Sequence, residues 1–441
     1  MNMNYKRLYI IALLIFTNII NTTAQEVLSL QQVLEKAKEH NKTLKISENE
    51  MLMADEKHKE VRSNLIPKVQ AAGDYKYFFD LPTQLMPAKA FNPMAPEWEF
   101  KPAQFGVPHN INANVQVMLP VFNPQLFTNI KTTKIAKELS QLKYRKTKEQ
   151  IFYDVSNLYY NAQIIKSQMD FVKANINNTQ KLLDNLKLLY KHDLAKGSDV
   201  DKIDLQLQQL NSQLQQADAN YQQVLDALKF YMGIPLDTQI DVQKDIDITD
   251  ATYAYNKENT TDFKMAKTKT RLIENEIKSL KRSRLPTLSL LASYGTTGYG
   301  YDEKPHDFLD FYDVSFVGAK LSIPVFNGTT TTHKIKQKKY ELENSKIQQE
   351  LVADKKSMEI KSAELKKAIN KTNIQNMKNQ VALAQKIYDQ TILEQKEGTA
   401  SLTDVIMADS SLRQAQQNYL QAEIDYLKAD LELKKITGHI K

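Results

Sequence analysis

Two periodicities of apolar residues divide this chain of 441 residues. Between Ile111 and Val121 apolar and polar residues alternate, which predicts a β-strand with one apolar face. A counterpart runs from about Val314 to Val325. Elsewhere apolar residues recur at steps of four and three, which predicts coiled-coil helices. In the first such stretch they are Ile151, Val155, Leu158, Ala162, Ile165, Met169, Val172, Ile176, Leu183, Leu186 and Tyr190.

Two helices of unusual length are predicted, over Pro124–His192 and Gly328–Lys396, each roughly 100 Å long at 1.5 Å per residue. After the break at residues 192–199, a return helix continues the rhythm. Its apolar positions are Ile203, Leu207, Leu210, Leu214, Ala217, Tyr221, Val224, Leu228 and Tyr231, and those of its counterpart are Ala415, Tyr419, Ala422, Tyr426, Ala429, Leu433 and Ile436. With an opening helix over Leu28–Asn64, the pattern predicts a rod in which pairs of short helices lie end to end beside long ones.

The chain contains a tandem duplication. "LPVFNP" at residues 119–124 returns as "IPVFNG" at residues 323–328, and Asp199 and Gly233 correspond to Asp404 and Gly438 at an offset of 205. Repeats of this length indicate two copies of one structural unit. We expect a first repeat over 25–240, a linker over 241–258 and a second repeat over 259–441. Each reads helix, strand, loop, strand, long helix, return helix.

The repeated Pro-Val-Phe-Asn motif predicts a junction between a strand and a helix. Pro120 cannot donate to a strand ladder, Asn123 suits an N-cap, and Pro124 suits the first helical position. The second copy is expected to use Pro324, Asn327 and Gly328 in the same way, with Asn327 repeating the cap.

Residues 1–24 are typical of a secretory signal peptide. Lys6 and Arg7 precede an apolar run from Leu8 to about Ile20, and small residues follow it. The alternative is a membrane helix, but about 13 apolar residues fall short of the roughly 20 that a span needs.

Composition excludes several kinds of chemistry. The chain has no Cys, so it holds no disulfide or Cys-bound metal. Its seven His form no close pair, and no phosphate loop or nucleophile motif is present, so we expect no enzyme, cofactor or metal site. Without Lys6 and Arg7 the charge is 57 − 52 = +5, spread along helices, which favours solvated helix faces over a nucleic-acid surface.

Four strands per chain, apolar on one face, would leave two open sheet edges, so we expect closure with other copies into a membrane barrel. An eight-stranded barrel is filled by its own side chains, which favours three copies and twelve strands for an open pore. Aromatic residues near the strand ends fit a membrane girdle, although a soluble β-sandwich is the alternative: Tyr75, Tyr77, Phe78, Phe79, Trp98, Tyr294, Tyr299, Tyr301, Phe308, Phe311 and Tyr312. The Pro-rich loop Leu81–Pro108 would face outside.

Taken together, the duplication, the junctions and two further segments resemble the TolC-type outer-membrane efflux proteins. The segments are "LSLQQVLEKAKEHNKTLK" at residues 28–45 and "KEGTASLTDVIMADSSLRQAQ" at residues 396–416. The resemblance implies an α+β membrane protein. In it, a homotrimer forms a twelve-stranded β-barrel in outer-membrane lipid on an α-helical barrel in the periplasm. It further implies a passive exit duct joined to a periplasmic adaptor and to an inner-membrane pump or ABC transporter, for drugs, metal ions or polypeptides.

In this family the hairpin tips form the gate. The resemblance assigns that role to Asp199 and Asp404, with Gly398 in the second tip. Asp193 stands where the first tip's glycine is expected, and a left-handed turn tolerates Asp. Met407 replaces a second acidic residue, which leaves one acidic layer per tip. Carboxylates around a threefold axis would favour cations; alternatively, the two Asp residues are N-caps of the return helices.

Two other classes of protein fit part of the pattern. One is a structural or adhesive coiled-coil envelope protein without a conduit, against which the strand alternation argues. The other is a soluble periplasmic adaptor, which carries one hairpin and a lipoyl-like domain, whereas this chain has two hairpins.

Overall fold

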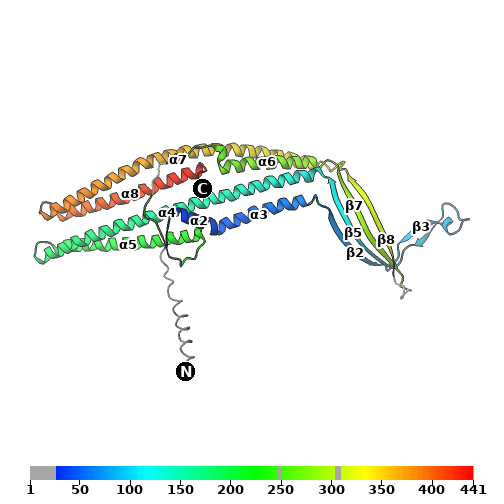
Figure 1. Ribbon diagram of the computed structural model, residues 1–441, viewed down its shortest axis with the longest axis horizontal. Coiled ribbons are helices and arrows are strands. Elements are labelled where there is room, and N and C mark those ends of the chain that lie inside the picture. Colours follow the sequence, from blue (N-terminus) through cyan, green and yellow to red (C-terminus); the bar gives the residue numbers. More distant parts are fainter. Residues whose placement is uncertain (1–25, 247–250, 303–308, 441) are drawn as a thin grey trace, which may run out of the picture. The chain divides into compact units, whose positions relative to one another are not determined.

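The structure is a computed structural model that describes residues 26–246, 251–302 and 309–440 (Figure 1). The predicted signal peptide lies outside these residues. The described residues form two compact units: unit 1 comprises residues 26–51, 140–246, 251–267 and 347–440, and unit 2 comprises residues 52–139, 268–302 and 309–346.

Unit 2 contains the predicted four-stranded sheet. Its strands are β2 (Lys68–Tyr77), β5 (His109–Phe122), β7 (Thr287–Gly300) and β8 (Asp310–Ser322), all antiparallel, in the order β2-β5-β7-β8. The two sequence repeats therefore contribute one hairpin-like pair each, joined through β5 and β7. Within the described residues, β2 and β8 each pair on one side only, so both edges of the sheet are open.

Helical segments of unit 2 lie in one layer. They belong to α3 (Lys42–Ser63), α4 (Pro124–Lys191), α6 (Thr261–Arg282) and α7 (Thr330–Lys396). His58 of α3 contacts Thr133 of α4 (Nδ1–Oγ1 2.9 Å), and Ser279 of α6 donates to Asn129 of α4 (2.6 Å). Thr270 of α6 bonds to Ser345 of α7 (2.9 Å). These contacts give the order α3-α4-α6-α7.

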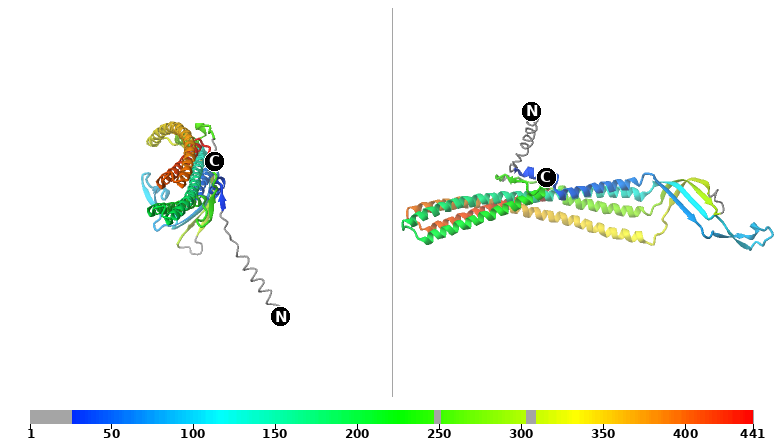
Figure 2. Two further views of the ribbon diagram at one scale, coloured as in Figure 1. Left: turned by 90° about the vertical axis from the view of Figure 1, so that its left-hand side faces the viewer. Right: turned by 90° about the horizontal axis from the view of Figure 1, so that it is seen from below.

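Unit 1 is built from two helical hairpins, α4 with α5 (Gly197–Met232) and α7 with α8 (Leu402–Ile436), which lie side by side (Figure 2). Leu183 of α4 packs on Ile203 of α5, Asn175 of α4 bonds to Gln416 of α8, and Tyr388 of α7 packs near Leu412 of α8, giving the order α5-α4-α8-α7. Apart from Tyr190, which is half exposed, the predicted seam residues are buried or half-buried, as coiled-coil packing requires.

The opening helix is not continuous, contrary to the sequence expectation. It consists of α2 (Leu30–His40) and α3, separated at Asn41. The Asn41 side chain donates from Nδ2 to the carbonyl of Tyr231 (2.8 Å) and accepts from the amide of Leu44 (3.0 Å). Because the Asn41 side chain caps the first turn of α3 and is itself held by the end of α5, α3 begins there as a new helix.

Two short strand pairs were not expected. In unit 1, β1 (Glu26–Leu28) pairs in parallel with β6 (Ile240–Val242). In unit 2, β3 (Thr83–Pro87) pairs with β4 (Phe100–Gln104) inside the predicted Pro-rich loop. Single-turn helices cover Ala88–Ala90 and Lys257–Asn259.

The two strand-to-helix junctions differ. β5 continues past Pro120 to Phe122, with a register shift between them, so the strand does not end at the proline as expected. Asn123 then caps α4 as predicted, because its Oδ1 accepts from the amide of Leu126 (2.9 Å) and Pro124 is the first helical residue.

At the second junction the expectation of a repeated cap was wrong. β8 ends at Ser322, before Pro324, and α7 starts only at Thr330. Gly328 (φ 64°) and Thr329 (φ 67°) are both left-handed, and the Asn327 amide donates to the Thr331 hydroxyl. Asn327 therefore lies outside the N-cap position.

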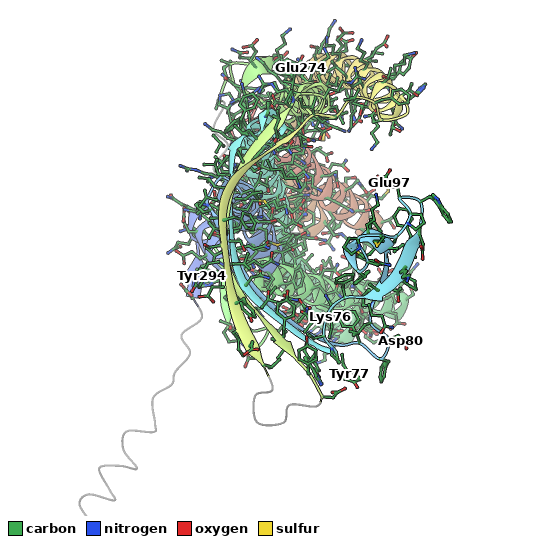
Figure 3. The ribbon with its side chains drawn as sticks, turned by 90° about the vertical axis from the view of Figure 1, so that its right-hand side faces the viewer. Lys76, Tyr77, Asp80, Glu97, Glu274 and Tyr294 are labelled. Atoms are coloured by element: carbon green, nitrogen blue, oxygen red, sulfur yellow. The ribbon has the colours of Figure 1, made fainter. Side chains whose placement is uncertain are left out.

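Aromatic side chains are exposed along the curved sheet, where Tyr77 and Tyr294 are seen in Figure 3. The alternation of the sequence is not matched by burial of one face, since both faces of β2 and β8 are open to solvent in a single chain. Among the described helices, none has a stretch long and apolar enough to cross a membrane.

Candidate gate at the hairpin tips

The first tip, between α4 and α5, consists of residues 192–196. Asp193 adopts a left-handed backbone (φ 57°), as predicted from its place at the expected glycine. The amide of Leu194 then closes back onto the carbonyl of Leu189 (2.9 Å), which satisfies one of the free carbonyls at the end of α4. The Asp193 carboxylate is exposed at the end of the hairpin.

The second tip, between α7 and α8, has the same length, over residues 397–401. Gly398 takes the left-handed conformation (φ 77°), and the amide of Thr399 bonds to the carbonyl of Glu394 (2.9 Å). The two tips thus share one backbone path, with Asp in one and Gly in the other.

Asp404 is part of a capping box at the start of α8. Ser401 is the N-cap, and its hydroxyl accepts from the amide of Asp404 (3.2 Å). In return, Oδ2 of Asp404 accepts from the amide (2.9 Å) and the hydroxyl (2.7 Å) of Ser401. These hydrogen bonds hold the pKa of the Asp404 carboxyl below its usual value, since they favour the charged form. The alternative that Asp404 is itself the N-cap was therefore wrong, because the N-cap is Ser401, three positions earlier.

Asp199 occupies the equivalent third position of α5, but without the box. The N-cap there is Lys196, whose side chain makes no capping hydrogen bond. The Asp199 carboxylate instead accepts from Lys202 one turn further on (3.3 Å). It is not an N-cap either, and both carboxylates sit where they complement the positive end of a helix dipole.

The two tips are joined by an apolar cluster. Leu183 and Leu186 of α4 and Ile203 of α5 are buried, and Leu402 and Ile406 of α8 pack against them. The first turn of α8 therefore lies on the other hairpin. Met407 does not belong to this cluster and is 63% exposed.

A buried polar layer just behind the tips was missed in the sequence. Asp409 of α8 is buried, accepts from Gln206 of α5 (2.5 Å) and forms an ion pair with Arg413 (3.0 Å). Burial raises the pKa of the Asp409 carboxyl, and Arg413 and Gln206 oppose that rise. The signal was present: Val405, Asp409 and Leu412 follow the four-three spacing of the seam, as do Ile203, Gln206 and Leu210.

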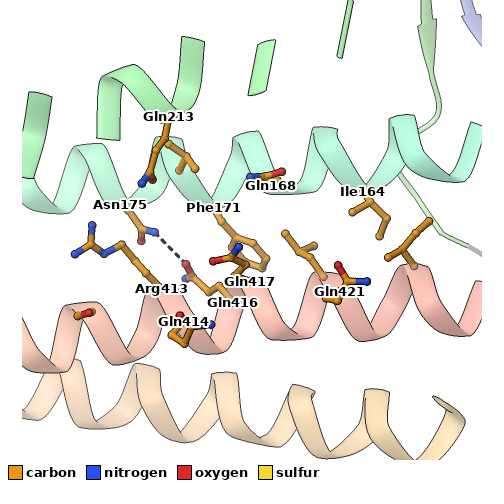
Figure 4. A pocket seen from close by; sticks show the side chains of 14 residues that line it. Ile164, Gln168, Phe171, Asn175, Gln213, Arg413, Gln414, Gln416, Gln417 and Gln421 are labelled. Atoms are coloured by element: carbon orange, nitrogen blue, oxygen red, sulfur yellow. Dashed lines mark hydrogen bonds between the residues drawn. The ribbon is translucent and has the colours of Figure 1, made fainter. Parts of the chain in front are cut away.

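Further along, a polar groove separates α4 from α8 (Figure 4). Asn175 crosses it to Gln416 (3.0 Å). The remaining lining is rich in amides, from Gln168, Gln213, Gln414, Gln417 and Gln421. Among the described residues, no group of three His, Asp or Glu side chains could hold a metal ion.

Comparison with known proteins shows what this chain is similar to. The family described as outer membrane efflux protein matches residues 255–439. Outer membrane protein TolC of Salmonella enteritidis is 20% identical over 427 residues, covering 95% of this chain and 83% of that protein. Outer membrane efflux protein BepC of Brucella suis is 28% identical over 166 residues, covering 37% of this chain and 35% of that protein.

Solved structures share the fold. The outer membrane protein VceC of Vibrio cholerae superimposes with a TM-score of 0.73 at 14% identity, covering 93% of this chain and 96% of that one. The CmeC outer membrane channel of Campylobacter jejuni also gives 0.73 at 14% identity, covering 93% of this chain and 85% of that one.

Proposed function

We propose the function of this chain on the premise that it is an outer-membrane efflux protein of the TolC type. Such a protein is a channel rather than an enzyme, and its helices extend into the periplasm. Three copies form a passive exit duct. It receives its cargo from a periplasmic adaptor and an inner-membrane pump or ABC transporter, and it opens and closes at the hairpin tips.

One observation carries the proposal, namely the two open edges of the sheet. Each described strand of the order β2-β5-β7-β8 is long, and β2 and β8 expose a row of unpaired backbone groups. Such edges in a membrane must be closed, because no water satisfies them there. Joining β8 of one copy to β2 of the next closes three sheets into twelve strands with room for a pore.

A second feature agrees with this arrangement. The face of α7 that its own chain leaves exposed carries apolar residues at steps of seven and four, with one step of fourteen across Asn376. This is the pattern of a coiled-coil seam that lacks its partner. The apolar residues are Tyr340, Ile347, Leu351, Met358, Leu365, Ile369, Leu383 and Ile387. Since α7 ends the helix order in both units, a neighbouring copy is the partner that this seam fits.

The sheet closure is tested by cysteine cross-linking, which the natural absence of Cys makes specific. Ala71→Cys in β2 and Val317→Cys in β8 are combined in one chain, with neighbouring positions scanned because the register between copies is to be found. Oxidation in outer membranes should give dimers and trimers and nothing larger. Each single variant alone should yield no trimer, and a ladder continuing beyond three would refute the closed ring.

The gate is tested by separating charge from capping. Asp404→Asn removes the charge but keeps an oxygen for the box, whereas Ser401→Ala breaks the box and keeps the charge. In planar bilayers, Asp404→Asn should reduce cation selectivity by severalfold and Ser401→Ala should leave it near the unmodified value. Equal selectivity in both would restrict Asp404 to capping. A purified trimer without any conductance would favour the coiled-coil envelope protein instead.

A further inference from the structure

Unit 1 contains a charged cavity where two short helices meet end to end. α8 ends at Ile436 and α6 begins at Thr261, and both are flanked by the uninterrupted α4 and α7. Two helix ends leave a gap that continuous helices would have filled with side chains. Lysines from three helices line this cavity: Lys146 of α4, Lys355 and Lys356 of α7, and Lys435 of α8.

The carboxylates of the cavity already have cationic partners. Asp262 is paired with Lys146 and with Lys356 (3.0 Å), and Glu359 with Lys356 (3.0 Å) and, more distantly, Lys355 (3.7 Å). The two remaining carboxylates turn to partners outside the lining, Glu149 to Arg145 (3.1 Å) and Glu432 to Lys366 (4.0 Å).

Lys435 is different from the other three lysines. In the part of the chain that the structure describes, its ammonium forms no ion pair with a carboxylate; it donates to the Gln150 side-chain oxygen (2.7 Å) and lies 4.1 Å from the centre of the Tyr153 ring. Burial lowers the pKa of Lys435, and the charges of Lys146 and Lys356 lower it further, against Asp154 and Asp262. The lining holds four lysines and four carboxylates, and Lys435 is the lysine among them whose ammonium no carboxylate contacts in the described residues.

We propose that this cavity binds a small divalent oxyanion of the phosphate type, with Lys435 as its principal ligand and Lys146 and Lys356 in support. A tetrahedral oxyanion offers several acceptors at once, so one molecule can accept from ammonium groups that converge from three helices. Binding would link α8 to α4 and α7, whose Lys146 and Lys356 already hold Asp262 of α6, and so brace the joint between α8 and α6.

The test uses inorganic phosphate and the full chain in detergent at constant ionic strength, with chloride as the balancing anion. Isothermal titration calorimetry should show phosphate binding, and the thermal midpoint should rise with phosphate more than with chloride. Lys435→Gln should weaken the affinity by about tenfold, as expected for losing one charge-assisted contact. Lys435→Arg should retain most of it, which separates loss of charge from misfolding.

Lys361→Gln provides the matched control, because Lys361 is exposed on α7 outside the cavity. It should bind phosphate as the unmodified chain does. Sulfate should substitute for phosphate if charge and shape are what the site recognises. The proposal is overturned if phosphate stabilises no more than chloride does, or if Lys435→Gln binds as tightly as the unmodified chain.

Discussion

The two sequence repeats share one order of elements but close their ends differently. At the first junction a single residue, Asn123, separates strand from helix, whereas residues 323–329 fill the second. At the tips the roles are reversed: the first lacks a capping side chain, and the second has a complete box at Ser401 and Asp404. A duplicated fold thus keeps its long helices and strands while each connection is stabilised separately.

The largest difference in stability between equivalent substitutions in the two repeats is expected at the ends of the return helices. Gly233 (φ 67°) and Gly438 (φ 78°) are equivalent, but a Cβ on Gly233 would meet the His40 backbone, with its carbonyl carbon at 2.8 Å, whereas the nearest atom to Gly438 is 4.0 Å away. Gly233→Ala should cost about 3–5 kcal/mol, from left-handed strain plus the clash. Gly438→Ala should cost about 1–2 kcal/mol, from strain alone. Thermal unfolding of both variants measures this, and equal costs would mean that α2 yields at His40.

The next largest change in stability is expected at the two tips, where substitutions at equivalent positions should act in opposite directions. Gly398→Ala places a side chain in a left-handed conformation with free space around it, so it should destabilise the second tip by about 1–2 kcal/mol. Asp193→Gly relieves the same strain in the first tip and should stabilise it by up to about 1 kcal/mol. Hydrogen exchange of the tip amides reports each change locally. Should both substitutions act in the same direction, the tips do not share the backbone path described above.

A smaller effect distinguishes the junctions. Asn123→Ala removes the cap of α4 and should cost about 1 kcal/mol. Asn327→Ala removes only a bond to the Thr331 hydroxyl and should cost less than half of that. Denaturant unfolding compares the two, and a larger loss at Asn327 would show that the second junction depends on its asparagine after all.

The smallest effect is on the pH dependence of stability, which should differ between Asp404 at the tip and Asp409 in the buried polar layer. The lowered pKa of Asp404 means that its stabilising contribution is present above the ordinary value of 3.8 and is lost as pH falls through the folded pKa. The raised pKa of Asp409 has the opposite sign, so stability falls as pH rises through that pKa. Asp404→Asn should reduce the loss of stability in acid, and Asp409→Asn should flatten the decline above the ordinary value. Melting midpoints between pH 3 and pH 7 check both, and identical profiles would contradict the assignment.

Regular features of the molecule were predictable because they repeat along the chain. The seam from Ile151 to Leu186 and the strand around Val117 are each specified by many residues at one spacing. The break at Asn41 was not predictable, since it depends on the carbonyl of Tyr231, 190 positions away. The left-handed Thr329 likewise has no local signal, because a β-branched residue is unfavourable there.

The candidate gate was predictable in part. Asp193 was expected to turn left-handed, because the other tip has Gly398 at the same place. The capping arrangement was assigned to the wrong residue, as the shift from Asp404 to Ser401 depends on where the helix begins, which sequence places only within a few residues. To predict the buried layer at Asp409, a polar residue in the apolar seam would have to be interpreted as a hydrogen-bond partner of another helix rather than as an exception to the apolar pattern.

The pairing of β1 with β6 has a consequence for the order of folding. Glu26 is matched to Ile240, a separation of 214 positions, and Leu28 beside it is fully buried. Contacts so remote in sequence form late, because the intervening chain must first be brought together. If the protein crosses a translocon from its N-terminus, β1 emerges early but can pair only after β6, almost half the polypeptide later, has emerged as well. Pairing of β1 with β6 therefore requires that the first half of the chain is complete.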